Sequence, residues 1–211
     1  MAKGASLLDM TKRTVEKEFW DWFIRHDAVL LNFETDQEAI FDQLAAQMQK
    51  VDASLCFEFG PKGAQREFVI SAGGIRSAFA AVVSLSKAAP DLHSWRVTAF
   101  RPRRASLNAV EFQGKQINPN DVQFSLLDNG KIAGVILYIP GYREDDIDFK
   151  QIGYLMLDED LGEFDVETKI GLVRMLSPES DATQDRYPLA ELPDYFDQLA
   201  CRIDGRSRKA Q

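Results

Sequence analysis

The chain has few of the residues that carry covalent or metal chemistry. Its 211 residues include only two cysteines, Cys56 and Cys201, and two histidines, His26 and His93. Two cysteines can build neither a disulfide-rich scaffold nor a four-cysteine zinc site. The histidines stand in neither a HExxH nor a HxxxH pattern, which excludes a histidine-rich metal site. We therefore expect no metal and no cofactor.

Long apolar runs are also missing from the sequence. No stretch approaches the ~18 consecutive apolar residues that a membrane helix needs. The first 13 residues lack the apolar core of a secretory signal. From these two features we expect a cytoplasmic protein without a membrane partner.

The composition is that of an ordinary globular protein with an acidic balance. Hydrophobic residues make up 45% and charged residues 27% of the chain, which excludes a wholly disordered protein. The 25 basic and 33 acidic residues give a net charge of −8. Because negative charge repels a phosphate backbone, we expect no nucleic-acid partner.

The charge is distributed unevenly along the chain. Residues 141–170 contain ten acidic and three basic residues, whereas residues 96–104 contain four arginines and no acid. Two explanations remain open: the arginines neutralise the acidic segment within the protein, or a basic protein partner does so from outside. The residues of the predicted partner surface are Asp158, Glu159, Asp160, Glu163, Arg101 and Arg103.

The first half of the chain shows helical and strand periodicity in turn. Residues 7–25 are predicted to form a helix, with Trp22 largely buried in a stripe of apolar residues. A second helix is predicted over residues 36–50. Residues 54–59 and 67–71 alternate as strands and are joined by glycine- and proline-containing turn residues, which predicts a hairpin.

The second half contains the strongest turn signal in the sequence. Asn129-Gly130 tolerates positive φ at both central turn positions, so it is expected to join two strands tightly. The second of these strands, residues 132–139, is almost continuously apolar, which predicts that both its faces are covered. A helix from about residue 148, a strand over residues 170–176 and a final helix ended by Gly205 are expected to follow.

Helices and strands do not alternate strictly in this order. We therefore predict an α+β fold with a mostly antiparallel sheet covered by helices. No linker or change in composition divides the chain, so a single domain is expected over residues 1–205. The last six residues, 206–211, are predicted to be a disordered basic tail.

One local sequence could bind a ligand. A predicted strand ends at Ser71, two glycines follow, and a helix is expected to begin near Arg76. Backbone amides at such a helix start can hold an anion, whereas the glycines could equally serve only to give positive φ. The segment matches neither the GxGxxG nor the P-loop pattern. The predicted ligand-binding residues are Ser71, Gly73, Gly74, Arg76, Trp95 and Arg96.

Five segments of the sequence form a recognisable set of motifs. They are Phe19-Trp20-x-Trp22-Phe23, residues 68–72, residues 89–97, residues 99–103 and Leu161-Gly162-Glu163. Together these motifs resemble an uncharacterised bacterial domain family of unknown function. The resemblance implies a small cytosolic α+β protein and assigns no catalytic residue.

Two functions follow from these observations. The sequence has no GxSxG nucleophile motif, no metal-ligand set and no cofactor fingerprint, which favours a non-enzymatic binding or regulatory module with an acidic surface. The alternative is a domain or enzyme that binds a small molecule or an anion at the Gly73-Gly74 turn. A pocket in which the predicted side chains converge would favour the alternative.

Overall fold

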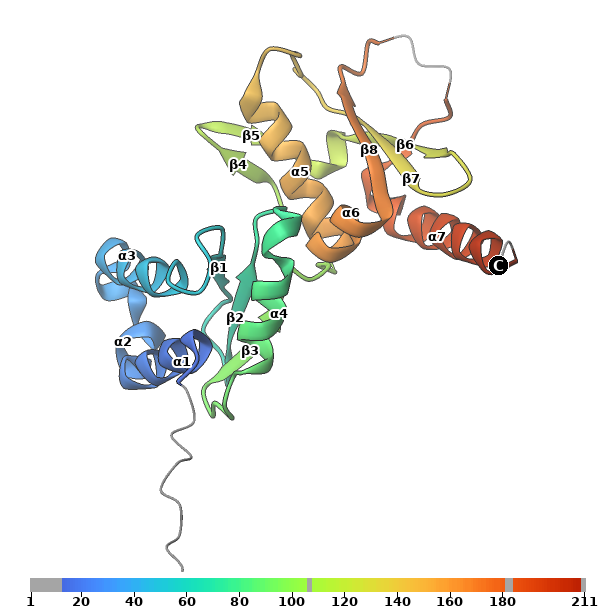
Figure 1. The fold of residues 1–211 in the computed structure, drawn as a ribbon. Coiled ribbons are helices and arrows are strands. Elements are labelled where there is room, and N and C mark those ends of the chain that lie inside the picture. Colours follow the sequence, from blue (N-terminus) through green and yellow to red (C-terminus); the bar gives the residue numbers. More distant parts are fainter. Residues whose placement is uncertain (1–12, 106–107, 181–183, 210–211) are drawn as a thin grey trace, which may run out of the picture. The chain divides into compact units, whose positions relative to one another are not determined.

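The computed structural model describes residues 13–105, 108–180 and 184–209. The chain divides into two compact units, residues 1–99 and residues 100–211, which we name the N-terminal unit and the C-terminal unit. Figure 1 shows the helices and strands of both. The prediction of a single domain over residues 1–205 stays a prediction.

The N-terminal unit contains a three-stranded sheet in the order β1-β2-β3. β1 pairs antiparallel with β2, which confirms the predicted hairpin, and β2 pairs parallel with β3. The parallel pair arises because α4 carries the chain back before β3 begins. The elements of this unit are α1 (Val15–Arg25), α2 (Asp27–Leu31), α3 (Gln37–Met48), β1 (Cys56–Phe59), β2 (Arg66–Ser71), α4 (Phe79–Lys87) and β3 (Trp95–Ala99).

Aromatic side chains build the core of the N-terminal unit around β2, whose six residues are all buried. The ring of Phe68 on β2 stacks on Phe23 of α1 with 5.0 Å between centroids. Trp20, also on α1, donates an indole hydrogen bond of 2.9 Å to the carbonyl of Leu85 on α4. These contacts hold α1 against β2 and connect α1 to α4.

The C-terminal unit contains a four-stranded sheet in the order β8-β7-β6-β9 and a small hairpin, β4-β5. β7 pairs antiparallel with β6 and parallel with β8. The elements of this unit are β4 (Val110–Phe112), β5 (Lys115–Ile117), β6 (Gln123–Asp128), β7 (Ala133–Tyr138), α5 (Ile147–Leu161), α6 (Glu163–Lys169), β8 (Ile170–Leu176), β9 (Tyr187–Pro188) and α7 (Leu192–Lys209).

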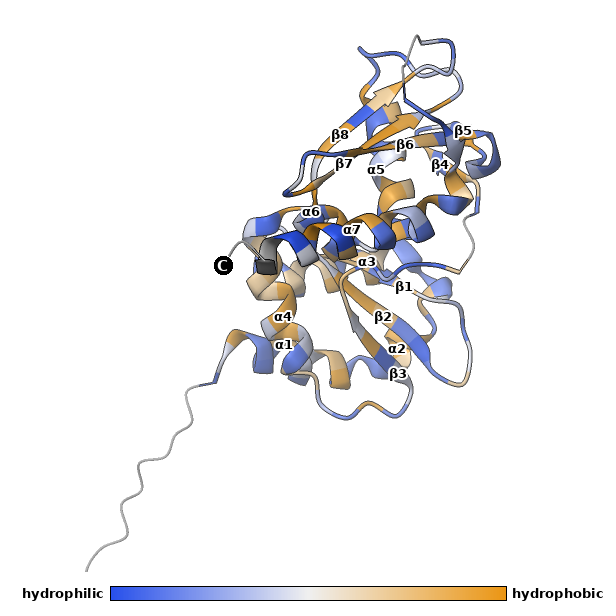
Figure 2. Ribbon diagram, turned by 90° about the vertical axis from the view of Figure 1, so that its right-hand side faces the viewer, coloured by the Kyte–Doolittle hydropathy of each residue, from blue (hydrophilic) through white to orange (hydrophobic). Residues whose placement is uncertain are grey.

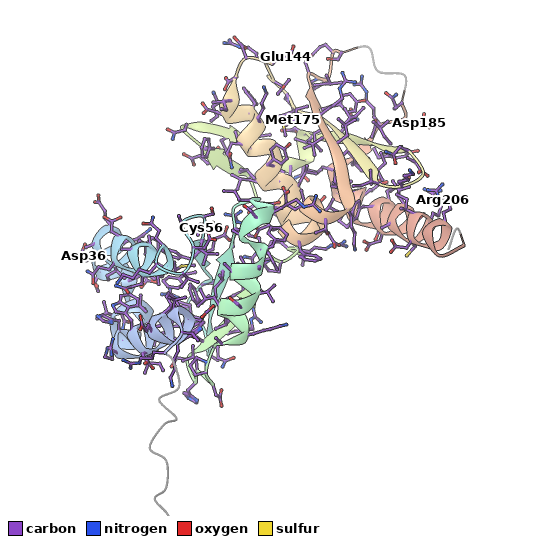
Figure 3. The ribbon with its side chains drawn as sticks, in the orientation of Figure 1. Asp36, Cys56, Glu144, Met175, Asp185 and Arg206 are labelled. Carbon is purple, nitrogen blue, oxygen red and sulfur yellow. The ribbon has the colours of Figure 1, made fainter. Side chains whose placement is uncertain are left out.

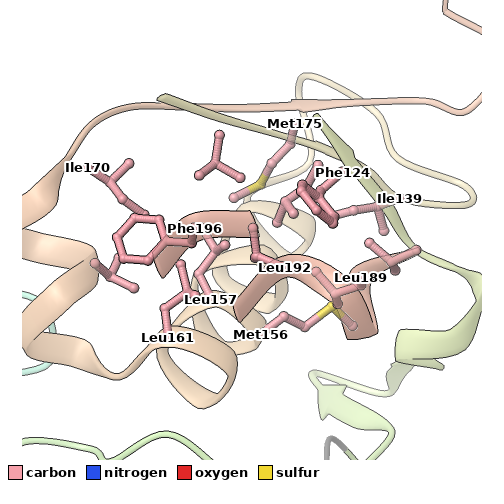
Figure 4. Packing of buried hydrophobic residues seen from close by; sticks show 14 of the residues in the cluster. Phe124, Ile139, Met156, Leu157, Leu161, Ile170, Met175, Leu189, Leu192 and Phe196 are labelled. Carbon is pink, nitrogen blue, oxygen red and sulfur yellow. The ribbon is translucent and has the colours of Figure 1, made fainter. Parts of the chain in front are cut away.

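The core of the C-terminal unit lies between this sheet and its helices. Figure 4 shows Ile139, at the end of β7, and Phe124 of β6 packed among Met156, Leu157 and Phe196. All six residues of β7 are buried, so the prediction that both faces of this strand are covered is confirmed. Figure 2 shows the strand as a largely hydrophobic band.

Asn129-Gly130 joins β6 to β7 in a hairpin as predicted, but through the four residues 129–132 rather than a tight two-residue turn, and Asn129 does not adopt positive φ. Gly130 has φ +87°, and Asp128 accepts a hydrogen bond from its N–H at 2.8 Å. The side-chain oxygen of Asn129 accepts bonds from the N–H groups of Lys131 and Ile132. The turn is therefore held by its own side chains as well as by the strand ladder.

The α+β class is confirmed, and four of the six strand pairs among the described residues are antiparallel. The two larger sheets are nevertheless mixed rather than purely antiparallel. Each contains one parallel pair, β2-β3 in the N-terminal unit and β7-β8 in the C-terminal unit. In both, a helical crossover between the paired strands returns the chain to the same direction. Among the described residues, no helix combines the length and the apolar character that crossing a bilayer requires.

The C-terminal residues differ from the sequence prediction. The tail was expected to be disordered from Arg206, yet α7 continues through Gly205 to Lys209. The guanidinium of Arg206 donates two hydrogen bonds of 2.8 Å to the carboxylate of Asp128. This contact with the β6-β7 turn stabilises the helix beyond a glycine that would otherwise favour its end. Residues 210–211 lie outside the described residues.

The buried face of α1 also differs from the predicted stripe. Phe19, Trp20 and Phe23 are buried, whereas Trp22 is half-buried and Val15 is exposed. The ring of Trp22 stacks on His26 at 4.4 Å instead of entering the core. Trp20 and Trp22 both lie at helical spacing from other apolar residues, so periodicity alone could not predict which of the two faces the core.

Replacing Trp20 with alanine is expected to lower the free energy of unfolding by about 3–5 kcal/mol, because it removes a buried ring and leaves a cavity. Trp22→Ala should lower it by only about 1–2 kcal/mol, since this ring already meets water on one side. Urea unfolding of both variants measures the difference. An equal loss for the two, or a larger loss for Trp22→Ala, would contradict the observed packing of α1.

Candidate functional site

Residues 100–104, which we name the arginine segment, lie against the junction of α5 and α6. The N–H of Glu163 donates to the carbonyl of Arg101 at 3.0 Å, and the N–H of Arg101 donates to Glu163 Oε2 at 3.1 Å. The N–H of Arg104 donates to the carbonyl of Glu159 at 2.7 Å. The backbone of the segment is thereby fixed to the end of one helix and the start of the next.

The side chains of the arginine segment extend this attachment to three helices. Arg101 contacts the carboxylate of Asp158 at 3.3 Å. Arg103 donates to Asp165 on α6 at 2.9 Å and makes two hydrogen bonds, of 2.9 and 2.8 Å, to Asp197 on α7. Its Nε also donates to the carbonyl of Leu161 at 2.8 Å. Such charge-assisted pairs are among the stronger hydrogen bonds in proteins.

The predicted partner surface is corrected by these contacts. Asp158, Asp160 and Glu163 are 7%, 5% and 0% exposed, so a protein partner cannot reach them. Arg101 and Arg103 are occupied by carboxylates of this chain, and Glu159 is only half-buried. A count of charges along the sequence does not show which side of α5 each one occupies.

Neutralisation within the protein also extends to the start of the acidic segment. Lys115 of β5 bonds to Asp146 at 2.7 Å and to Asp148 at 2.6 Å. Among the ten acidic residues of the segment, all of them described, only Glu144 and Asp145 are fully exposed. The segment therefore does not present a broad acidic face.

Burial changes the protonation of two of these carboxyl groups. Removal from water raises the pKa of Asp158 to about 7 and that of Asp160 to about 7, although Arg101 and Arg103 respectively act in the opposite direction. Among the described residues, Oδ2 of Asp160 is buried without a hydrogen-bond partner. Protonation of Asp160 therefore removes an uncompensated buried charge.

The Gly73-Gly74 turn has the conformation that only glycine adopts easily. Gly73 has φ +57° and Gly74 has φ +79°. The hydroxyl of Ser71 accepts the N–H of Gly73 at 2.9 Å, and the carbonyl of Ala72 accepts the N–H of Ile75 at 3.0 Å. Two of the amides that could face an anion are therefore bonded within the turn. An anion site here stays a prediction.

The other predicted ligand residues do not lie at this turn. In the parallel register, Trp95 is opposite Arg66 and Arg96 is opposite Glu67, at the start of β2, whereas the glycines follow its end. The indole of Trp95 donates to Asp27 at 2.7 Å, and Arg96 pairs with Glu67 at 3.2 Å. The structure separates the predicted constellation because sequence proximity does not reveal the direction of strand pairing.

A groove between β6 and α7, which we name the β6-α7 groove, is a stronger candidate site. It encloses about 420 Å³ at the edge of the sheet. Sequence periodicity could not predict it, because half of its lining residues come from β9 and α7, which lie far from β6 in the sequence. Figure 3 shows Asp185 beside it. Its lining residues are Phe124, Leu126, Gln184, Asp185, Tyr187, Tyr195, Gln198 and Arg202.

Aromatic rings form one end of the β6-α7 groove. Tyr187 and Tyr195 lie 4.4 Å apart between ring centroids, and Phe124 packs edge-on against Tyr195 at 5.8 Å. Burial, followed by the neighbouring Tyr187 and Glu191, raises the pKa of Tyr195. Its hydroxyl therefore stays a neutral hydrogen-bond donor and acceptor at physiological pH.

An arginine lies at the other end. Arg202 is exposed, seven residues along α7 from Tyr195, and within the described part of the chain it forms no ion pair or hydrogen bond. Its neighbour Arg206 is already bound to Asp128. Arg202 is thus a cation available to a ligand in the groove.

The edge of β6 also has backbone groups facing the groove. The carbonyl of Val122 accepts a bond from Leu189 on the β9 side, so the alternate residues Leu126 and Asp128 turn their N–H and C=O to the same side. β9 pairs only with Gln123 and Phe124. Within residues 108–180 and 184–209, no strand pairs with the rest of this edge, where Ser125 Oγ donates to the carbonyl of Asp185 at 2.7 Å and Arg206 binds the carboxylate of Asp128.

No metal centre is found in the part of the chain that the structure describes, since no three His, Cys, Asp or Glu side chains are grouped there. Both cysteines are free thiols.

Gly73→Ala is expected to lower the free energy of unfolding by roughly 1–2 kcal/mol, because alanine is disfavoured at positive φ. The added Cβ would lie 3.5 Å from Cys56 Sγ, an ordinary contact, so backbone conformation alone produces the loss. The matched control is Gly63→Ala, an exposed glycine in the preceding loop without positive φ, which should change stability by less than about 0.5 kcal/mol. Equal losses from chemical unfolding would remove the conformational argument.

Stability should fall as the pH rises from about 5 to 7. The folded pKa values of Asp158 and Asp160 lie above the unfolded value, so the folded state holds more protons in this window and loses stability as they leave. The slope is at most about 1.4 kcal/mol per pH unit for each carboxyl group. Carboxylates with lowered pKa, such as Asp128 and Asp197, titrate below this window.

Asp160→Asn should reduce the fall in the free energy of unfolding between pH 5 and 7, because an asparagine amide does not ionise in this range. Urea unfolding at pH 5, 6, 7 and 8 measures the slope, and Glu144→Gln, a change at an exposed carboxylate, serves as the control. A wild-type protein whose stability is constant or rises between pH 5 and 7 would contradict the burial of these carboxyl groups.

Comparison of the chain with protein-family models, with curated proteins and with solved structures finds no match in any of the three. The resemblance to an uncharacterised bacterial domain family therefore stays a prediction, and function has to be inferred from the geometry of the chain itself.

Proposed function

We propose that the chain is a non-enzymatic binding module that holds an extended peptide segment in the β6-α7 groove. The segment adds to the outer edge of β6 and places a carboxylate against Arg202. The single observation that carries the proposal is the position of Arg202, which forms no ion pair or hydrogen bond among the described residues although, after the hydrogen bond from Arg206, its charge also lowers the pKa of Asp128. It lies beside an aromatic groove and a strand edge that β9 pairs with only in part.

The backbone of β6 supports an extended ligand. Leu126 and Asp128 offer N–H and C=O groups toward the groove, and strand addition uses such groups for affinity while side-chain pockets give specificity. An added strand would continue the sheet where β9 stops. α7 forms the opposite wall and would contact the side chains of the ligand on one face.

The lining side chains define the sequence of the ligand. Tyr187 and Tyr195 offer flat, partly apolar surfaces with polar tips, a combination that is enriched at binding sites. Arg202 suits a carboxylate, because its guanidinium can form two parallel hydrogen bonds. It lies at the other end of the groove, so this carboxylate would be two or more residues along the ligand from the residue that meets the tyrosines. The preferred ligand therefore contains an apolar or aromatic residue and, a few residues before or after it, an Asp or Glu.

The groove favours binding over catalysis. Its eight lining residues include no serine, cysteine or histidine, so they form neither a Ser-His nor a Cys-His nucleophile pair. The free cysteines fit a reducing compartment, and we include a cytoplasmic location in the proposal. The expected partner changes from a basic protein to a carboxylate-bearing segment, because the acidic residues 158–163 are largely buried.

Selection from a random heptapeptide library displayed on phage tests the proposal. The wild-type chain should enrich peptides with Asp or Glu near an aromatic or branched apolar residue, and synthetic copies should bind in a fluorescence-polarisation assay. Arg202→Gln should weaken binding about tenfold or more, since a hydrogen bond to a charged group contributes about 1.5–3 kcal/mol.

The matched control is Arg143→Gln, which removes an exposed arginine in the loop before α5 and should leave binding unchanged. Amide chemical shifts of Leu126 and Asp128 should move on titration with the selected peptide. A library that enriches no sequence above background, or peptides that bind Arg202→Gln as tightly as wild type, would overturn the proposal.

A further inference from the structure

The opposite edge of the same sheet is formed by β8, and the described part of the chain has no strand on its outer side. The N–H of Ile139 donates to the carbonyl of Leu176, so Leu176 and the alternate residues Arg174 and Leu172 face β7. Val173 and Met175 therefore direct their N–H and C=O groups outward. We name this outer side the β8 edge.

The β8 edge has almost none of the features that keep sheet edges from pairing. Its sequence, residues 170–176, contains no proline and a single charge, Arg174. Leu172 is 47% exposed, although it lies in the middle of the strand. The irregularity in pairing with β7 lies only at the start of the strand, between Ala133 and Gly134, which leaves residues 172–176 regular.

A groove of about 310 Å³ runs along the C-terminal half of the β8 edge. Tyr154 and Lys150 of α5 form one wall, Tyr142 and Glu144 close its end, and the last four residues of β8 form the floor. Figure 3 shows Glu144 and Met175 in this region. The opposite, N-terminal end of β8 follows Lys169, whose side chain pairs with Asp165 at 2.9 Å and is still 44% exposed, so its ammonium can also meet a carboxylate from outside.

We propose that two copies of the chain associate about a two-fold axis by antiparallel pairing of their β8 edges. Val173 lies opposite the partner's Val173, and Leu172 lies opposite the partner's Arg174. This register overlaps residues 170–176 of both strands, the whole of β8, and is centred on an outward-facing residue. It goes beyond the proposed function and leaves the β6-α7 groove, at the other edge of the sheet, accessible.

Charge supports a second copy as the occupant. Antiparallel pairing brings the end of β8 lined by Glu144 to the end of the other strand that begins after Lys169. Within the described residues, Glu144 has no ion pair. A two-fold axis makes each of these contacts twice, because the same patch serves both copies. The interface closes after two copies, because each copy uses its single β8 edge in the two-fold contact.

Sedimentation velocity and light scattering over about 1–200 µM test this proposal. The wild-type chain should reach about twice its mass of 23.8 kDa. Val173→Pro removes an outward N–H without removing a bond to β7, and it should raise the dimer dissociation constant at least tenfold. Val173→Thr keeps that N–H and a similar shape, so it should remain dimeric.

A second pair of variants tests the proposed register of the two β8 strands. Both change Leu172, whose side chain is exposed and lies outside the buried core. Leu172→Glu places a carboxylate opposite the partner's Arg174 and should tighten the dimer, whereas Leu172→Arg opposes like charges and should weaken it. The difference should shrink in 0.5 M salt.

Mass and melting temperature together decide the outcome. A wild-type chain that is monomeric at every concentration overturns the proposal, as does a dimer that folded Val173→Pro or Leu172→Arg leaves unchanged. The peptide-binding variant Arg202→Gln should dimerise normally, so loss of groove binding and loss of dimer are distinguishable.

Discussion

The whole structure depends on the burial of one strand in each unit on both of its faces. All six residues of β2 and all six of β7 are buried, and each strand has a neighbour on either side. A strand enclosed in this way needs helices or loops on both faces to cover its side chains. Both units reach this arrangement by the same order of connections, an antiparallel hairpin followed by a helical crossover to a parallel strand, although no sequence repeat marks it.

Helix placement in the C-terminal unit depends further on the arginine segment. Arg103 bonds to Asp165 and Asp197 and to the carbonyl of Leu161, so a single guanidinium connects α5, α6 and α7. Such a network replaces hydration of the charges with hydrogen bonds of defined direction. The buried carboxyl groups of Asp158 and Asp160 stay partly protonated near neutral pH because this replacement is incomplete around them.

The two proposals concern the two edges of the four-stranded sheet. One edge, beside α7, combines backbone groups, tyrosine rings and Arg202. The other, β8, has an apolar sequence without the charges or proline that protect an edge. Strand edges offer directional hydrogen bonds, so both are suited to extended chains, a peptide in one case and a second copy in the other.

The sequence by itself determined the features that depend on neighbouring residues. Alternating apolar residues gave the β1-β2 hairpin, Asn129-Gly130 gave the β6-β7 turn, and the continuous apolar run gave the buried β7, because turn geometry and strand burial are local properties. The α+β class followed from the order of these elements.

Tertiary structure alone decided everything that depends on direction and on facing side chains. Parallel pairing placed Trp95 far from Gly73, the packing of α5 turned Asp158 and Asp160 inward, and the contact of Arg206 with Asp128 extended α7. It also assembled the β6-α7 groove from residues more than 50 positions apart. A charge or an aromatic ring has the same identity in the sequence whether it faces water or a neighbouring helix, so only the packed chain distinguishes a partner surface from an internal ion pair.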